Sequence, residues 1–428
     1  MSSRVRGTQE AVAFCRSFPL PTLGRAIRQL LRGTGIVHSR TASPVRTAPS
    51  EDHRATPLEL FFDVIYVFAF TEVTHLAVED ASLLGVLRAL AVFGVLWWSW
   101  ASYAWLANQM HVGRGIGRLG TLAAIVLVFM LALAIPEAFH RLVGPLVFAV
   151  GFILVSVIYT AVTFAAAGTD ARLRRQVVRT MGTTLLPVSV ALLAGALIGG
   201  TAQLVLWLAA VVVEGVTIRI TSRGGAWRLP SAGHFAERHQ LVVILALGES
   251  IISIGSGAGA HRLDAGVLTA ALLAVGLAVA MWWTYFPHLA QAAQRAVAGR
   301  AGESRASLAT AGTYLHAGIV GGILLVAVGL ATALHGAETG GALGGFGAAT
   351  LGGGLAVYLA ITALYERSMT GRATAARWVA ALLAAISVPA LAAMPIVAGL
   401  LLAVVIGLCP AMPWASRLSL PGRLTPRK

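Results

Sequence analysis

Long uninterrupted apolar runs are the feature that most constrains how this chain can fold. They recur along most of its length, and each is about 18 residues or more, enough to cross roughly 30 Å of hydrocarbon as an α-helix. Composition agrees, because 57% of the residues are hydrophobic and 11% are charged. The runs lack the polar and apolar alternation of a lipid-facing barrel strand. The sequence therefore predicts an all-α, polytopic integral membrane protein.

The apolar runs predict twelve transmembrane helices within a transmembrane domain at residues 56–412. The first six lie at 57–78, 82–107, 119–140, 143–167, 181–199 and 202–220. The second six lie at 239–257, 265–290, 309–334, 342–366, 376–393 and 395–412. Only Met394 and Pro395 separate the last two, so their division rests on a single proline signal.

The basic residues lie where the loops of such a protein would face the cytoplasm. The formal net charge is +15, and all but three of the 32 Lys and Arg fall in the two tails and in alternate loops. The three exceptions are Arg88, Arg141 and Arg262. Cytoplasmic loops carry the excess of Lys and Arg, so both termini are predicted to be cytoplasmic. The protein itself is predicted to lie in the plasma membrane. Topology explains the charge, so the lipid bilayer is an expected partner and nucleic acid is not.

Two tails flank the predicted transmembrane domain. Residues 1–55 are rich in Arg, Ser, Pro and Thr and should form a disordered cytoplasmic tail. The same composition fits a transit peptide, a lipid-facing basic tail or an over-long start, and these alternatives stay open. Residues 413–428 form a second basic cytoplasmic tail. The two cysteines, Cys15 and Cys409, lack the spacing of a metal or redox site.

The two halves of the predicted domain, 56–220 and 234–412, share a faint internal repeat. Each begins with a glutamate and has a second one twelve or thirteen residues later: Glu59 and Glu72 in the first half, Glu237 and Glu249 in the second. The next span of each half carries a tryptophan pair. Because six spans are an even number, such repeats would share one orientation in the membrane.

Carboxylates inside the predicted spans are the main candidates for function. An ionised Asp at the centre of a membrane helix costs roughly 2.5 to 3.5 kcal/mol on insertion scales, so such groups should face protein or a wet cavity. In the first span, Glu59, Asp63 and Tyr66 share one face at about 100° per residue. Glu72 and His75 lie on nearly the opposite face. One helix therefore offers two polar surfaces.

The seventh predicted span carries a second set of candidates. Glu237 and Arg238 stand at its cytoplasmic end, and Glu249 follows Glu237 by twelve residues, about 18 Å along a helix. A carboxyl this deep pairs with a cation, binds one, or carries a proton. For the residues close to the interface, helix capping or a structural ion pair explains the same pattern equally well.

Catalytic and cofactor motifs are missing from the sequence. It contains no HExxH zinc motif, no Walker loop and no dinucleotide fingerprint. No nucleophile, base and oxyanion set can be assembled from its residues, so an intramembrane enzyme is the weakest of the functions considered. We therefore expect no enzyme, no cofactor and no bound metal.

Three segments resemble the bacterial low-temperature-requirement A family. They are PLELFFD at residues 57–63, HFAER at 234–238 and ALGES at 246–250. The similarity covers about residues 55–410, and the tryptophan pairs fit it too. His239 and Gln240 stand where that family more often has an aromatic and an apolar residue. The resemblance implies a multi-pass membrane protein of a family named for a growth phenotype in the cold.

A weaker similarity connects FFD at residues 61–63 and the six-plus-six layout to the endolysosomal potassium-channel family. The first helices of that family carry a Phe-Ser-Asp signature. In this chain Leu241 stands where the seventh span aligns with Asp63, so the pore mechanism of that family is not carried over.

These patterns predict a secondary transporter or another ion-translocating protein, whose substrate is a small solute or an ion such as a proton. Its path would use Glu59, Asp63, Glu72, His75, Glu237, Arg238 and Glu249. The alternative is a non-transport membrane protein with a structural or cold- and envelope-stress role. Repeats and midplane carboxylates favour transport, whereas carboxylates each paired to an Arg in a dry core favour the alternative. The first and seventh spans should pack side by side, because their ionisable groups cannot face lipid cheaply.

Overall fold

The computed structural model describes residues 54–140, 142–222, 229–259, 264–337 and 341–412, which form an all-helical bundle. Apart from an isolated bridge between Ala342 and Pro395, no strand occurs in these ranges. The two tails predicted from the sequence lie almost wholly outside them. The described residues therefore belong almost entirely to the predicted transmembrane domain.

The first group of helices begins with α3, whose N-cap is Thr56 and whose first residue is Pro57. Thr56 has an extended backbone, its hydroxyl accepts the N–H of Glu59, and Pro57 takes the first helical position, where its missing N–H costs nothing. The helices of this group are α3 (Pro57–Glu79), α4 (Leu83–Gln109), α5 (Gly115–Leu133), α6 (Val143–Ala166), α7 (Ala171–Ile198) and α8 (Gly200–Thr221).

The second group contains shorter pieces that are divided at prolines. Pro287 lies in the π-helical turn η1, and Pro395 immediately precedes α16. Proline has no backbone N–H, so it interrupts the hydrogen bonds of a regular helix. The elements are α9 (Ala232–Gly259), α10 (Ala265–Tyr285), η1 (Phe286–Ala290), α11 (Gln291–Ala298), α12 (Gly302–Gly336), α13 (Gly344–Thr370), α14 (Ala375–Ile386), α15 (Val388–Ala393), α16 (Ile396–Leu408) and the 3₁₀ turn η3 (Cys409–Ala411).

Ten helices in the described ranges are long and apolar enough to cross a membrane, with α10, η1 and α11 counted as one. They confirm the architecture of a polytopic α-helical membrane protein. The helices α14 and α16 are apolar but shorter, with 12 and 13 residues. The last two of the twelve predicted spans therefore stay predictions.

Three helices begin seven or more residues earlier than the apolar runs indicated. The observed and predicted starts are Ala171 and 181 for α7, Ala232 and 239 for α9, and Gly302 and 309 for α12. An apolar run ends at the first cluster of polar residues, whereas a helix continues while its backbone hydrogen bonds are made. At α7 the Asp170 side chain also accepts the N–H groups of Arg172 and Leu173. The predicted loop at 168–180 is therefore mostly helix.

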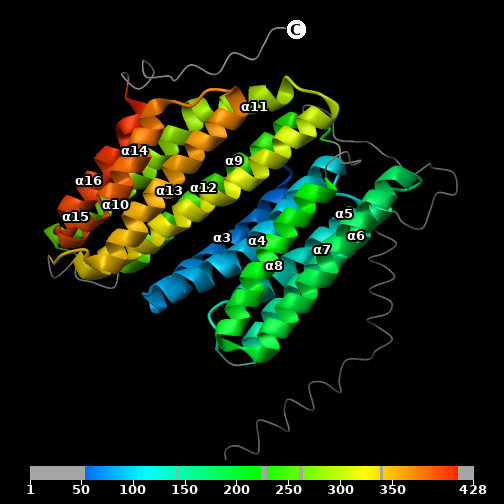
Figure 1. Ribbon diagram of the computed structural model, residues 1–428, viewed down its shortest axis with the longest axis horizontal. Helices are drawn as coiled ribbons and strands as arrows, with labels where there is room; N and C mark the ends of the chain where they lie inside the picture. The colour runs from blue at the N-terminus through cyan, green and yellow to red at the C-terminus, as the bar shows by residue number, and fades with distance from the viewer. Residues whose placement is uncertain (1–53, 141, 223–228, 260–263, 338–340, 413–428) are drawn as a thin grey trace, which may run out of the picture. The chain divides into compact units, whose positions relative to one another are not determined.

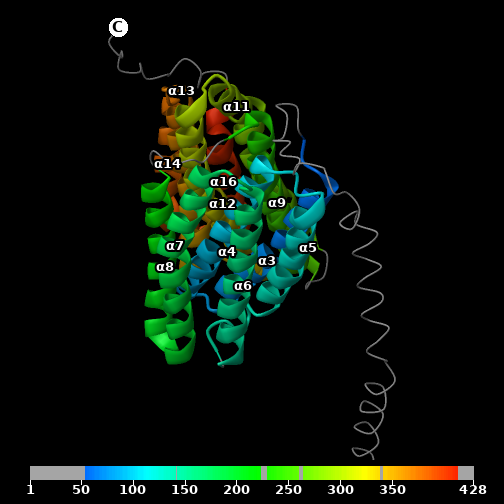
Figure 2. The ribbon, with the colours of Figure 1, turned by 90° about the vertical axis from the view of Figure 1, so that its right-hand side faces the viewer.

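The two groups of helices meet along α3 and α12. Figure 1 shows α3–α8 gathered on one side and α9–α16 on the other, and in Figure 2 the long helices run alongside one another. Helix α3 packs against α9 and α12, and α4 contacts the same two helices. The prediction that the first and seventh spans lie side by side is confirmed.

Helix α12 lies deep in the bundle because glycines let α13 approach its backbone. A Cβ atom on Gly322 would lie 2.8 Å from the backbone nitrogen of Tyr358, and one on Gly329 would lie 2.6 Å from that of Leu351. Small residues at such positions are how membrane helices pack tightly without a hydrophobic driving force. This packing holds the polar residues of α12 inside the protein.

Helices α3 and α9 run parallel and in register. His234 meets Glu59 and Arg238 meets Asp63, and in both pairs the residue numbers differ by 175. Further along, Thr74 faces Glu249, again with a difference of 175. A constant difference requires two helices that run in the same direction with the same rise per residue. A repeat with one orientation needs such a parallel pair, but the repeat itself stays a prediction.

Candidate functional site

A buried ion pair joins α3 to α9. Arg238 donates two hydrogen bonds to the Asp63 carboxylate, with 2.7 Å from Nη1 to Oδ2 and 2.8 Å from Nη2 to Oδ1. Both residues are 1% exposed. Bidentate pairs of this kind combine charge with fixed geometry, and removing one partner from a buried pair strands the other. The pair therefore fastens the two helices together.

Glu59 and His234 complete this group, which we call the Arg238 cluster: Glu59, Asp63, His234 and Arg238. Glu59 Oε2 lies 2.7 Å from His234 Nε2 and 3.8 Å from Arg238 Nε. The other carboxylate oxygen accepts the Thr56 hydroxyl at 2.9 Å. Arg238 Nη1 also donates to the backbone carbonyl of Glu59 at 3.0 Å. The two carboxylates thus share one Arg and one His, and almost every polar atom of the cluster has a partner.

An aromatic side chain of α4 covers the Arg238 cluster. Trp100 Nε1 donates to Asp63 Oδ1 at 2.9 Å, and the Arg238 guanidinium lies 6.0 Å from the centre of the same residue's ring. The Trp100 ring also packs edge-on against His239 and beside Trp97. Trp100 is 0% exposed, so it excludes water from the ion pair. A dry surrounding makes each hydrogen bond of the cluster more costly to lose.

A second polar level lies beside the cluster, between α9, α10 and α12. His239 Nε2 is 3.1 Å from the Thr313 hydroxyl, which also accepts Trp105 Nε1 at 3.1 Å. The rings of His239 and His316 meet edge to face at 4.9 Å, and His316 Nε2 is 2.7 Å from the Tyr285 hydroxyl. In both histidines Nδ1 bonds to the carbonyl four residues earlier. Nδ1 is therefore the donor, and Nε2 is left as the acceptor of the neutral ring.

A cavity of about 70 Å³ adjoins this level, between α4, α6, α7, α8 and α12. Thr313 lies in its wall, so the Thr313 hydroxyl connects the cavity with His239. The rest of the wall combines hydroxyl groups with aromatic rings: Ser102, Thr180, Ser222, Thr310, Trp98, Trp105, Tyr159 and Tyr314. Because one water needs roughly 10–15 Å³, the cavity has room for several.

Glu249 lies apart from the cluster, further along α9. It is 0% exposed, and its Oε1 accepts the Ser253 hydroxyl at 2.7 Å. Its Oε2 has no hydrogen-bond partner in the part of the chain that the structure describes. Thr74 of α3 faces it, and Thr74 also lines a cavity of about 20 Å³ between α3, α4 and α12. That volume holds about one water.

An apolar layer separates Glu249 from the Arg238 cluster. Arg238 and Glu249 are eleven residues apart, about 16 Å along the helix, and α9 is apolar from Leu241 to Leu247. On the facing helices, the buried rings of Phe70, Phe93 and Trp97 follow one another at centroid distances of 6.0 and 6.1 Å: Phe70 to Phe93, then Phe93 to Trp97. Packed side chains therefore isolate the two polar sites from each other.

A family comparison covers both of these sites. Residues 54–411 match the family described as bacterial low temperature requirement A protein (LtrA). The chain belongs to the LtrA family. It is also 31% identical over 297 residues to an uncharacterized protein, RA0937, of Rhizobium meliloti (strain 1021), an alignment that covers 67% of this chain and 71% of the relative. No solved structure matches the chain.

The LtrA membership confirms the resemblance drawn from the three sequence segments, and these segments hold the two sites. Four of the seven predicted path residues lie in the two sites: Glu59, Asp63 and Arg238 in the cluster, and Glu249 by itself. Within the described ranges no three His, Cys, Asp or Glu side chains converge on a point where a metal ion could bind. The cluster is thus built from ion pairs and hydrogen bonds between protein groups.

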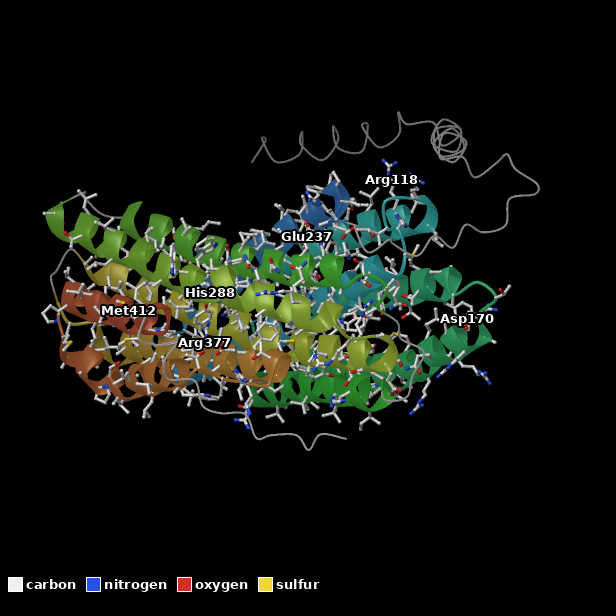
Figure 3. All side chains as sticks on the ribbon, turned by 90° about the horizontal axis from the view of Figure 1, so that it is seen from above. Arg118, Asp170, Glu237, His288, Arg377 and Met412 are labelled. Carbon is white, nitrogen blue, oxygen red and sulfur yellow. The ribbon has the colours of Figure 1, made fainter. Side chains whose placement is uncertain are left out.

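The structure places the other three predicted residues elsewhere. The Oε2 atom of Glu237 accepts the backbone N–H of Ala55 at 2.9 Å, and Figure 3 shows Glu237 near the blue ribbon of α3. Glu72 is half-buried and His75 exposed, and they lie near each other on a different face of α3. These three residues do not contribute to the Arg238 cluster or to the surroundings of Glu249.

Two polar residues of this LtrA protein escaped the sequence reasoning. Glu214 lies in the second half of α8, half-exposed, directly after three valines. The test that selected Glu249, a carboxyl within an apolar span, would also have selected Glu214. Asn108 is fully buried; it donates to the Ser231 carbonyl at 2.7 Å and lies 3.4 Å from Nδ1 of His234. Its position at the end of a predicted span gave no signal, because amides are common at helix ends.

Proposed function

We propose that this LtrA protein translocates an ion across the membrane, and that Glu249 carries it as a proton or a bound cation. The observation that supports the proposal is the isolation of this carboxyl, which is fully buried with one oxygen lacking a partner. An ionised carboxylate without a counter-charge is costly in hydrocarbon, so Glu249 must hold a proton or a cation while the protein encloses it. Releasing that ion on one side of the membrane and taking it up on the other is transport.

The Arg238 cluster has a different role in this proposal. Its carboxylates are already bound by the Arg238 guanidinium and the His234 ring within about 4 Å, so they have little affinity left for a passing ion. The cluster keeps α3 and α9 in register and thereby holds Thr74 against Glu249. It supports the carrier and does not carry the ion itself.

The cavity of about 70 Å³ is the proposed entrance from the side of the membrane at which α8 ends. Ser222 in its wall follows the end of α8, close to Arg219. Between His239 and Glu249 the apolar layer fills the space. An ion can therefore reach Glu249 only if the two helix groups move against each other. Movement of one helix group against the other around a midplane site is a common mechanism of secondary transporters.

The proposed topology has twelve crossings, with α14 and α15 together as the eleventh and α16 as the twelfth, and both termini in the cytoplasm. Single cysteines in a background without Cys15 and Cys409 test its orientation as far as the start of α12. Ala81→Cys, between α3 and α4, should react with an impermeant maleimide added outside intact cells. Ser304→Cys, near the start of α12, should react only after the cells are opened. Labelling of Ser304→Cys from outside would contradict the topology.

A second candidate function is a structural or cold- and envelope-stress role without transport. The pairing of Glu59 and Asp63 with Arg238 in a dry core favours it, because carboxylates of this kind tie helices together. The pairing does not extend to Glu249, which is why ion translocation is the leading proposal.

Ion flux into proteoliposomes tests the proposed function. With a pH-sensitive dye inside, and in parallel with Na⁺ or K⁺ gradients, the wild type should carry at least one of these ions. Glu249→Gln should abolish the flux, because the amide keeps the shape but cannot bind a proton or cation. Glu72→Gln is the matched control, since Glu72 also lies on a spanning helix but away from both sites. Its flux should equal that of the wild type.

Two results would contradict the proposal. Full flux in Glu249→Gln would remove Glu249 from the path. Absence of flux in the wild type under every gradient would favour the structural role.

A further inference from the structure

A membrane-facing groove of about 610 Å³ runs between α8 and α12, with Trp98 of α4 in its wall. Its sides are apolar, and the α8 valines that line it, Val212 and Val216, are 62% and 51% exposed. The groove is therefore accessible from the side of the bundle that faces lipid. It lies at the junction of the two helix groups.

The polar atoms along the groove are used by the protein itself. Trp98 Nε1 donates to the carbonyl of Val211 at 3.2 Å, and the Tyr314 hydroxyl donates to the carbonyl of Gly215 at 2.5 Å. One end of the groove is polar, because Arg219 near the end of α8 and Ser368 near the end of α13 line it. The groove is thus apolar along its length and basic at one end.

We propose that this groove binds an acyl chain of an anionic phospholipid, with the lipid phosphate at Arg219. This goes beyond ion translocation and does not depend on it. Arg219 is exposed and forms no ion pair within the described ranges, so its charge is available to a headgroup. Basic pockets between membrane helices are where anionic headgroups bind. A second apolar helix fits less well, because it would cover Arg219 without supplying a counter-charge.

The bound chain would also lie against the entrance cavity. Trp98 and Tyr314, whose ring centroids are 4.9 Å apart, line both the groove and the cavity of about 70 Å³. The two rings form a thin wall with lipid on one face and the cavity of about 70 Å³ on the other. An acyl chain in the groove would hold this wall in place and keep the cavity closed toward the bilayer.

Native mass spectrometry of the purified full chain tests the proposal. The probe is an equimolar mixture of phosphatidylglycerol and phosphatidylcholine with identical acyl chains. The wild type should retain phosphatidylglycerol in preference. Arg219→Gln should reduce that preference about fivefold, the ratio expected for one basic residue near an anionic headgroup. Val216→Trp should reduce retention of both lipids, because the indole fills the groove.

Matched controls lie on α7, outside the groove. Arg172→Gln removes an exposed arginine from the start of α7, and Val190→Trp enlarges a valine that is 58% exposed. Both should behave as the wild type. If Val216→Trp does not fold, Val212→Trp replaces it, since Val212 is the more exposed of the two.

Three results would overturn the proposal. Equal retention of the two lipids by the wild type would mean that Arg219 selects no headgroup. An equal loss in Arg172→Gln and Arg219→Gln would mean that lipid binds by overall charge. Unchanged retention in a folded groove-filling variant would mean that the groove is not where the lipid lies.

Discussion

The parallel seam between α3 and α9 has two polar ends that differ in how their charges are satisfied. At one end, Arg238 and Asp63 exchange two hydrogen bonds, and Glu59 and His234 complete the group. At the other end, Glu249 has a serine on its own helix and a threonine opposite, and one oxygen is left without a partner. Both ends are equally buried. Burial is therefore the same at the two ends, and they differ in whether a charged partner is present.

The largest effect on stability should come from removing Arg238 from its cluster. Arg238→Gln leaves Asp63 and Glu59 buried with only His234 for compensation, and loss of one partner from a buried ion pair costs about 3 to 5 kcal/mol. The free energy of unfolding in detergent, measured by denaturant titration, should fall by that amount.

A double variant checks that this loss comes from the pair. Asp63→Asn with Arg238→Gln should recover part of the stability, because neither residue then keeps an unpaired charge. If the two single effects simply add, Asp63 and Arg238 are not coupled, and the description of the cluster is wrong.

The next largest effect should come from Trp100→Phe. It keeps most of the aromatic packing and removes the hydrogen bond from Nε1 to Asp63. Hydrogen bonds to charged groups contribute about 1.5 to 3 kcal/mol, so the unfolding free energy should fall within that range. Trp98→Phe is the comparison, since Trp98 Nε1 donates to a neutral carbonyl and its loss should cost only about 0.5 to 1.5 kcal/mol. Equal losses would show that Asp63 is not charged.

A smaller effect is expected for Ser253→Ala at the unsatisfied end. The Ser253 hydroxyl donates to Glu249 Oε1, and a neutral carboxyl would make this an ordinary hydrogen bond of about 0.5 to 1.5 kcal/mol. A loss of about 1.5 to 3 kcal/mol would mean that Glu249 is ionised in the purified protein and holds a cation. The measurement thus distinguishes a proton from a metal cation as the occupant.

The smallest effect on stability should come from Glu249→Gln, the variant that we expect to abolish flux. No Arg or Lys pairs with Glu249 in the described part of the chain, so the amide strands no partner. The loss of unfolding free energy should be smaller than that of Trp98→Phe. A loss comparable to that of Arg238→Gln would show that Glu249 has a charged partner, and the contrast between the two ends would disappear.

The fold could be predicted from the sequence as far as hydrocarbon length determines it. Apolar runs found the ten long helices, since crossing lipid requires them. They could not find where α7 and α9 begin, because polar helix extends beyond the apolar part. The last pair of helices is divided by Pro395 into pieces too short for a length argument, so a count of twelve remains a prediction.

The candidate site could be predicted only as a set of residues. Cost in hydrocarbon selects Asp63 and Glu249, and it would have selected Glu214. Which of them has a counter-charge depends on the register between α3 and α9. Arg238 reaches Asp63 because 175 residues of intervening chain return α9 to the same level, a distance that no local pattern encodes. The same reason hides Asn108 and Thr313, whose partners lie on other helices.

The constant register of α3 and α9 also limits how the protein can move. Sliding α3 along α9 by one helical turn, about 5.4 Å, would bring either Val67 or Glu59 opposite Arg238. In both cases the bidentate contact with Asp63 would be lost, and an apolar side chain, Val78 or Phe70, would face Glu249 in place of Thr74. The contacts between the two helices therefore oppose sliding of one along the other. Movement of the two helix groups against each other would therefore have to be a rocking about the contact between α3 and α9, with bending in the surrounding helices, where Pro287 and Ser387 already interrupt the regular backbone.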